Sequence, residues 1–144
     1  MAKEVTLDSS VFVSAFVKGD RFRPMALRVM EKVFLGQYHV VTSAIVPVEV
    51  CGAISRRAGV DEAVLVKRQL DKWENMNFIV CSELTKRRRK EATEIAVKLK
   101  LKGMDAIVVQ VVKEKKAVLV TFDEEMAEKA KTIVEVLALK DLKK

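Results

Sequence analysis

The sequence contains few of the residues that build the common protein metal sites and covalent cross-links. Its 144 residues include two cysteines, Cys51 and Cys81, and a single histidine, His39. The cysteines lack metal-ligand spacing and are too few for a disulfide framework, so we expect both to be small buried hydrophobic residues. A histidine-based metal site or catalytic triad is likewise not expected, and we interpret His39 as structural.

Long apolar segments and linkers are also missing. No apolar run approaches the ~20 residues that cross a bilayer. The charged start of the chain is not followed by an apolar segment, so we expect no secretory signal, no membrane contact and a cytoplasmic location. No Pro/Gly-rich linker or repeat is found. We therefore assign residues 1–137 to one domain and residues 138–144 to a polar C-terminal tail.

Positive charge, in contrast, is abundant. Lys and Arg number 27 against 20 Asp and Glu, which gives a net charge of +7. Residues 86–102 include eight basic and two acidic residues, a net charge of +6 in this segment alone. Clustered positive charge favours a polyanionic partner such as nucleic acid. A solvated helix face explains the charge of this segment equally well.

Strand-like and helix-like segments alternate along the chain with short links. The expected strands are 5–7, 38–42, 78–80, 117–121 and 132–137. The expected helices are 9–17, 24–35, 43–57, 61–73, 85–100, 105–116 and a short one after residue 123. This alternation predicts an α/β protein with a mostly parallel central sheet and helices on both faces, a three-layer α/β/α architecture.

One segment, residues 106–112, could be either a strand or a helix. Its β-branched residues favour a strand. It continues into the charged run 113–116 and precedes the clear strand 117–121, so we predict a buried helix that begins at Asp105. We expect Gly103 to end the helix before it, and Asp61 to cap the helix 61–73.

Four acids stand out by their context. Asp8 and Asp123 follow predicted strands, and Asp105 opens an apolar helix. Each of these three is also a good helix N-cap, so none is informative alone. Glu49 is in phase with the apolar residues of helix 43–57. A carboxylate on that face is costly to bury unless it is paired or bound to a metal, although it could also lie at the rim and meet water or an arginine.

Carboxylates that gather at one edge of a sheet would make a metal site. They repel one another and raise each other's pKa unless a cation neutralises them. Oxygen ligands without His or Cys suit Mg²⁺ or Mn²⁺. Beside a basic surface such an ion suits phosphodiester hydrolysis, because it lowers the pKa of bound water and offsets phosphate charge. We therefore predict that Asp8, Glu49, Asp105 and Asp123 are both metal ligands and catalytic residues.

Four short motifs resemble those of the PIN-domain ribonucleases, particularly the VapC-type toxins of toxin–antitoxin pairs. They occur in the family's order over nearly the whole chain, and are Leu7-Asp8-Ser9-Ser10, Pro47-Val48-Glu49-Val50, Asp105-Ala106-Ile107 and Val120-Thr121-Phe122-Asp123. The resemblance implies that the first and fourth strands are adjacent at the sheet centre, and that the four acids surround one or two Mg²⁺ or Mn²⁺ ions. It also implies that the hydroxyls of Ser10 and Thr121 support these acids.

The resemblance further implies an RNA substrate, a small antitoxin protein as partner and a homodimer. We expect Arg87, Arg88 and Arg89 to bind RNA, with Arg88 placed to reach toward the body of the protein. Many family members carry a small residue where this chain has Gln110, a departure that removes no ligand.

The sequence fits two other functional classes less well. A haloacid-dehalogenase-like phosphatase needs a second Asp where this chain has Ser10, and a receiver domain needs an acidic neighbour for Asp8 and a late Lys. A non-catalytic RNA-binding PIN-like domain remains an alternative, as does an RNA-processing nuclease without an antitoxin.

Overall fold

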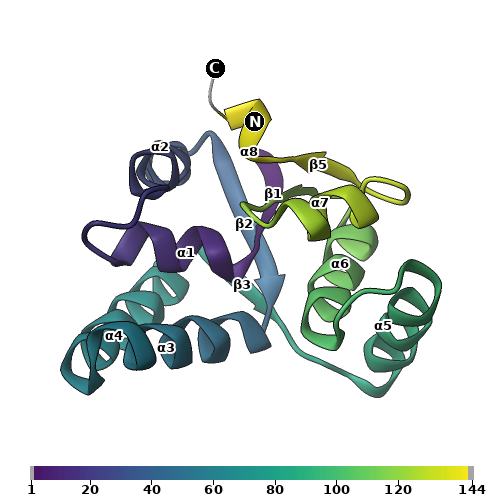
Figure 1. The fold of residues 1–144 in the computed structure, drawn as a ribbon, viewed down its shortest axis with the longest axis horizontal. Helices are drawn as coiled ribbons and strands as arrows, with labels where there is room; N and C mark the ends of the chain where they lie inside the picture. The colour runs from purple at the N-terminus through teal and green to yellow at the C-terminus, as the bar shows by residue number, and fades with distance from the viewer. Residues whose placement is uncertain (1, 143–144) are drawn as a thin grey trace.

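A sheet of five parallel strands forms the centre of the described chain, residues 2–142 of the computed structural model (Figure 1). The strands are β1 (Lys3–Leu7), β2 (Tyr38–Ser43), β3 (Ile79–Ser82), β4 (Val118–Val120) and β5 (Glu135–Leu137). Their order is β3-β2-β1-β4-β5, and all four neighbouring pairs are parallel. The prediction of a mostly parallel sheet with adjacent first and fourth strands is therefore confirmed.

The central strands are apolar on both faces, as expected for a parallel sheet covered on both sides. Val5 and Leu7 of β1 are fully buried, and so are Leu119 and Val120 of β4. In the register, Leu7 lies opposite Val120, so the two strands end at the same level. The residues that directly follow β1 and β4 therefore lie close together at the carboxyl edge of the sheet.

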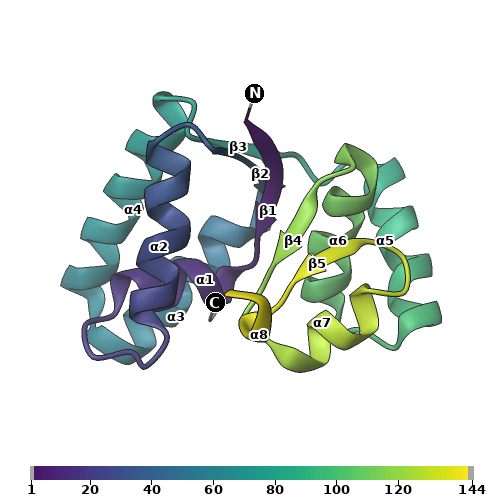
Figure 2. The ribbon, with the colours of Figure 1, turned by 90° about the horizontal axis from the view of Figure 1, so that it is seen from above.

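Helices cover both faces of the sheet, which confirms the three-layer architecture. Figures 1 and 2 show α1 to α4 gathered on one side of β1 and β2, and α5 and α6 on the other. The helices are α1 (Ser9–Phe16), α2 (Arg23–Phe34), α3 (Ile45–Ala58), α4 (Val60–Asn75), α5 (Lys86–Leu99), α6 (Gly103–Lys115), α7 (Glu124–Ala130) and α8 (Leu139–Leu142). Among residues 2–142, no helix combines the length and the apolar character that crossing a bilayer requires.

Two predicted helix boundaries are wrong. Asp61 does not cap α4, because Gly59 adopts a positive φ of 97°, ends α3 and starts α4 without a linker. Gly103 does not end α5. Lys100 does so in the left-handed conformation, and its carbonyl oxygen accepts a hydrogen bond of 2.9 Å from Lys129 Nζ. Gly103 is instead the first residue of α6.

The segment 106–112 forms a buried helix, as predicted. It lies within α6, which packs against β1 and β2 and carries five buried apolar residues between positions 106 and 112. Burial of this face outweighs the weak helix propensity of its valines. Asp105 lies in the first turn of α6, at the end nearest the carboxyl ends of the strands.

The expected polar tail includes a short helix. Leu139 of α8 is buried, Leu142 packs against the core, and the Asp141 carboxylate accepts a hydrogen bond from the Ala138 N–H. The tail's last residues, 143–144, lie outside the described residues.

The two cysteines are free and half-buried rather than fully buried. Cys81 lies on the edge strand β3, where one side of the sheet has no covering strand. Burial, together with the neighbouring Glu74 carboxyl, raises the pKa of the Cys81 thiol to about 12. Both thiols therefore stay protonated at neutral pH, since burial also raises the pKa of Cys51.

Candidate functional site

Asp8 lies at the carboxyl end of the central strand, where β1 passes into α1. Its backbone N–H donates a 3.0 Å hydrogen bond to the carbonyl oxygen of Val120, so the ends of β1 and β4 are joined directly. The side chain is only 5% exposed. A carboxylate this deep needs hydrogen-bond donors or a cation around it.

Two hydroxyls hold one oxygen of the Asp8 carboxylate. Ser10 Oγ donates to Asp8 Oδ2 at 2.8 Å, and Thr121 Oγ1 donates to the same oxygen at 3.0 Å. Ser10 Oγ also accepts from the Phe122 N–H, and Thr121 Oγ1 accepts from the Asp123 N–H. These hydroxyls therefore fix the side chain of Asp8 and tie the β1–α1 turn to the β4–α7 turn. Within residues 2–142, Asp8 Oδ1 receives no hydrogen bond.

Asp123 is the N-cap of α7. Its Oδ1 accepts a 3.0 Å hydrogen bond from the backbone N–H of Met126, as a capping Asp does. The side chain is exposed, and the cap uses only one of its two oxygens. Asp123 therefore combines the capping role with a second carboxylate oxygen that the cap leaves free, and its charge acts on Asp105.

Glu49 and Asp105 are half-buried, and both carboxyls have raised pKa values. For Glu49 the cause is first burial and then the negative charges of Asp8 and Asp105. For Asp105, burial together with the charges of Asp8 and Asp123 raises the pKa to about 6. These mutual effects link all four predicted acids, which the fold brings to one region at the carboxyl edge of the sheet.

The four acids approach one another without forming a compact cluster. Among residues 2–142, no three His, Cys, Asp or Glu side chains lie close enough together to form a metal-binding group. The donor set nevertheless fits a hard divalent cation, because it consists of carboxylate oxygens alone. Burial is the larger cause of the raised pKa values of Glu49 and Asp105, and repulsion by the neighbouring carboxylates, which such a cation would relieve, adds to it.

A narrow cavity opens beside two of the acids. Its volume is about 10 Å³, room for about one water molecule, and its walls include Asp105, Asp123, Lys102 and Lys129. The sequence showed Lys102 only as one member of the basic segment 86–102. It is the N-cap residue of α6 and Asp105 follows three positions later, a spacing that places two side chains close together at a helix start.

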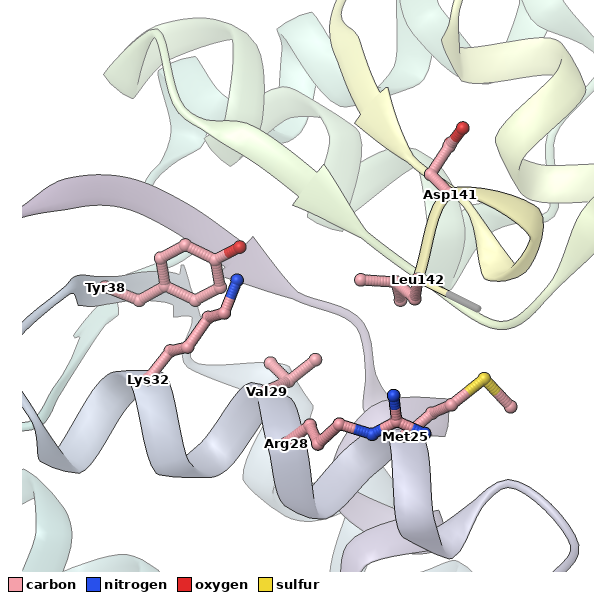
Figure 3. A pocket seen from close by; sticks show the side chains of 7 residues that line it. All are labelled: Met25, Arg28, Val29, Lys32, Tyr38, Asp141 and Leu142. Carbon is pink, nitrogen blue, oxygen red and sulfur yellow. The ribbon is translucent and has the colours of Figure 1, made fainter. Parts of the chain in front are cut away.

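A larger cavity, of about 150 Å³, lies away from these acids (Figure 3). It is lined by Arg28, Val29 and Lys32 of α2, with Tyr38 and Leu142. Its lining comes from α2, the first residue of β2 and α8, and includes none of the four acids. Lys32 Nζ lies over the Tyr38 ring, 5.3 Å from its centroid. This cavity is therefore separate from the candidate site.

The predicted RNA-binding arginines do not lie beside the acids. Arg88 donates from Nη2 to Glu114 Oε2 at 2.9 Å and from Nε to Oε1 at 3.1 Å, and Arg87 also binds Glu114. Glu114 lies in the last turn of α6 and Asp105 in its first, nine residues or about 13 Å away along the helix axis. Arg88 points toward the body of the protein, as predicted, with 18% of its side chain exposed. Arg89 is exposed.

Gln110 belongs to the same network as these arginines. It is 2% exposed, and its Nε2 donates to Glu91 Oε2 at 2.9 Å and to Glu114 Oε1 at 3.0 Å. The Arg88 guanidinium, followed by Gln110 and Arg87, holds the pKa of Glu114 well below its usual range. The residue that departs from the family pattern therefore links α5 to α6.

The family model of the PIN domain matches residues 5–132. The chain belongs to the PIN-domain family. No curated protein sequence matches this PIN domain significantly.

Solved structures share the fold of this PIN domain. VapC20 of Mycobacterium tuberculosis, described as a Sarcin-Ricin loop cleaving toxin, has 21% identity and a TM-score of 0.72 over 92% of this chain and 98% of its own. A chain from the complex of VapBC2 from Rickettsia felis with a promoter DNA fragment has 16% identity and a TM-score of 0.64, over 94% and 98%. A chain from DNA-bound VapBC of Salmonella typhimurium has 12% identity and a TM-score of 0.68, over 96% and 98%. The resemblance noted in the sequence is therefore confirmed at the level of family and fold.

Proposed function

We propose that this PIN domain is a metal-dependent endoribonuclease that hydrolyses phosphodiester bonds of RNA. One observation carries the proposal. Asp8 is fixed at the joined ends of β1 and β4, the charges of Glu49 and Asp105 interact with that of Asp8, and Asp123 interacts with Asp105. No histidine or cysteine contributes, so the site suits Mg²⁺ or Mn²⁺ and the hydrolytic chemistry of these ions.

Each side chain has a definite part in such a site. When bound, a divalent ion supplies an activated water and offsets charge on the phosphate. Asp8 presents Oδ1, because Ser10 and Thr121 occupy Oδ2 and prevent the side chain from rotating. Glu49 and Asp105 contribute desolvated carboxylates, whose negative charge a cation stabilises. Asp123 contributes the oxygen that capping of α7 leaves free.

The test is cleavage of RNA by the purified protein with Mg²⁺ or Mn²⁺. We expect cleavage to stop with EDTA and to fall by at least 100-fold in Asp8→Asn, which keeps the shape of the side chain and removes its charge. Asp61→Asn, an exposed acid in the first turn of α4, is the matched control and should retain activity. Cleavage that survives both EDTA and Asp8→Asn would refute the metal mechanism. RNA binding without cleavage would support the non-catalytic alternative.

We propose further that the protein is the toxin of a toxin–antitoxin pair, acting on RNA in the cytoplasm as a homodimer. VapBC chains of the same fold, crystallised as DNA-bound complexes, support an antitoxin partner. Induced expression in bacteria should arrest growth, and Asp8→Asn should abolish the arrest. Unimpaired growth with active nuclease would favour an RNA-processing nuclease without an antitoxin.

A further inference from the structure

The link between α5 and α6 brings a positive charge beside the acids. Arg87 and Arg88, at the start of α5, are bound to Glu114, at the far end of α6 from Asp105. Because α5 runs back along α6, its last residues and the link that follows return toward Asp105. Lys102 is the last residue of this link and is exposed.

Lys102 lies against the candidate site. It lines the narrow cavity together with Asp105 and Asp123. The pKa of Asp105 is raised by burial and by neighbouring carboxylates, and the positive charge of Lys102 acts against this rise. The same charge helps to lower the pKa of Glu125. Electrostatics and cavity geometry therefore both place its ammonium group beside the acids.

A second lysine of this cavity is already engaged. Lys129 Nζ donates to the Lys100 carbonyl oxygen at 2.9 Å and to Glu125 Oε1 at 2.8 Å. Lys102, in contrast, makes no ion pair or side-chain hydrogen bond within residues 2–142. Its three donors are therefore available to a ligand that approaches the acids from solvent.

We infer that Lys102 binds a backbone phosphate of the RNA next to the bond that is cut, and so positions the strand against the acids. This inference rests on the proposed nuclease function. Four carboxylates repel an RNA backbone, so a strand that reaches them needs a cation at the rim. An ammonium group suits phosphate as a compact point charge, and the N-terminus of the 13-residue helix α6 adds partial positive charge at the same place.

The kinetic test compares Lys102→Ala and Lys102→Arg with Lys72→Ala in cleavage of a short fluorescent single-stranded RNA with Mn²⁺. Lys72 is an exposed lysine of α4, across the sheet from α6 (Figure 1), and serves as the control. We expect Lys102→Ala to raise KM by about 5- to 10-fold and to change kcat by less than about twofold, because one phosphate contact is lost. Lys102→Arg should restore KM, and Lys72→Ala should change neither constant.

Binding gives an independent readout. Fluorescence anisotropy in EDTA over a range of NaCl concentrations should show that Lys102→Ala lowers the slope of log Kd against log salt by about 0.7, the loss of one single-strand phosphate contact. The assignment is overturned if KM and slope are unchanged, if kcat falls alone, or if Lys72→Ala has the same effect. If the unsubstituted protein does not cut RNA, the nuclease proposal fails. The binding assay still tests Lys102 in that case, and equal RNA binding by the unsubstituted protein and Lys102→Ala overturns the assignment of Lys102 as well.

Discussion

The hydroxyl of Thr121 donates a 3.0 Å hydrogen bond to the carboxylate of Asp8, which lies 113 residues earlier in the chain. The same hydroxyl accepts the N–H of Asp123, at 3.0 Å. Thr121 is fully buried, so water cannot replace either bond. One side chain therefore sets the positions of two of the four acids.

Thr121→Val should damage both stability and activity. The substitution keeps the shape of the side chain but leaves the Asp8 carboxylate with one donor and the Asp123 N–H with no acceptor. We expect the free energy of unfolding in urea to fall by about 1–3 kcal/mol, the cost of unsatisfied buried polar groups. RNA cleavage should fall by at least tenfold. Thr121→Ser keeps the hydroxyl and is the control, and equal losses in the two variants would contradict the role of the hydrogen bonds.

Asp105→Asn should stabilise the metal-free protein, in a manner that depends on pH. Folding raises the pKa of Asp105 from 3.8 to about 6. The protonated form is thus favoured in the folded state, and the stability that it contributes below pH 4 is lost as pH rises through 6. In EDTA at pH 8, we expect Asp105→Asn to raise the free energy of unfolding by about 1–2 kcal/mol, discounted for partial exposure.

The gain from Asp105→Asn should shrink to a small fraction at pH 4, because the carboxyl is then almost fully protonated in the folded state and, close to its ordinary pKa of 3.8, partly protonated in the unfolded state. Urea titrations at the two pH values measure the difference. A stabilisation of equal size at pH 4 and pH 8 would show that charge repulsion is not its cause. Asp61→Asn, on the exposed first turn of α4, should change stability little at either pH.

Mn²⁺ should raise the melting temperature of the protein through the four acids. A ligand at 100 times its dissociation constant adds about 2.7 kcal/mol to the free energy of unfolding. The shift should be larger at pH 8 than at pH 5, because the raised pKa values of Glu49 and Asp105 leave protons to displace at low pH. Differential scanning fluorimetry checks this, and Asp8→Asn should lose most of the shift. An equal shift in Asp8→Asn would place the binding of Mn²⁺ elsewhere.

Arg88→Ala should destabilise the fold more than Arg89→Ala, its neighbour. Arg88 makes paired bonds to Glu114, whose side chain is 19% exposed, whereas Arg89 is exposed. Removing one partner of a half-buried pair leaves a charge with less compensation, and we expect a loss of about 1–3 kcal/mol. For Arg89→Ala the change should stay within about 0.5 kcal/mol. Urea denaturation of the two variants measures the difference. Equal losses of unfolding free energy would contradict a stabilising role for the Arg88–Glu114 pair.

The arginine run also carries a separate prediction about RNA. If Arg89 contacts phosphate, Arg89→Ala should lower the salt slope of RNA binding by about 0.7 without loss of stability. An unchanged slope would mean that this part of the run is a solvated helix face. Arg87 and Arg88 are less suited to this test, because their substitution also breaks the bonds to Glu114.

The sequence predicted the parts of the fold that depend on local pattern. Strand β1 and Asp8 were visible because an apolar strand ends in a carboxylate, and periodicity alone placed Glu49 on the inner face of α3. The adjacency of β1 and β4 came from the family resemblance, since strand order is not a local property. The structure adds the bond between Thr121 and Asp8 that makes this adjacency part of the site.

Features that depend on long-range partners were not predictable in the same way. The pairing of Arg88 with Glu114 joins α5 to α6 across 26 residues, and the sequence showed only a basic run. Gly59 ends α3 as expected, but it also starts α4, two residues before the predicted cap Asp61. The end of α5 was placed at Gly103 instead of Lys100, because a left-handed residue can be a lysine as well as a glycine. The place of Lys102 beside Asp123 depends on how the α5–α6 link meets α7.

The bond between Thr121 and Asp8 also sets the order in which the site is completed during synthesis. A nascent chain that ends at residue 115 contains Asp8, Glu49 and Asp105, but neither β4 nor the hydroxyl that holds Asp8 nor the last acid. The exit tunnel of the ribosome must release Asp123 before the four carboxylates can meet. A chain still attached to the ribosome with β4 and α7 inside the tunnel therefore has no assembled site.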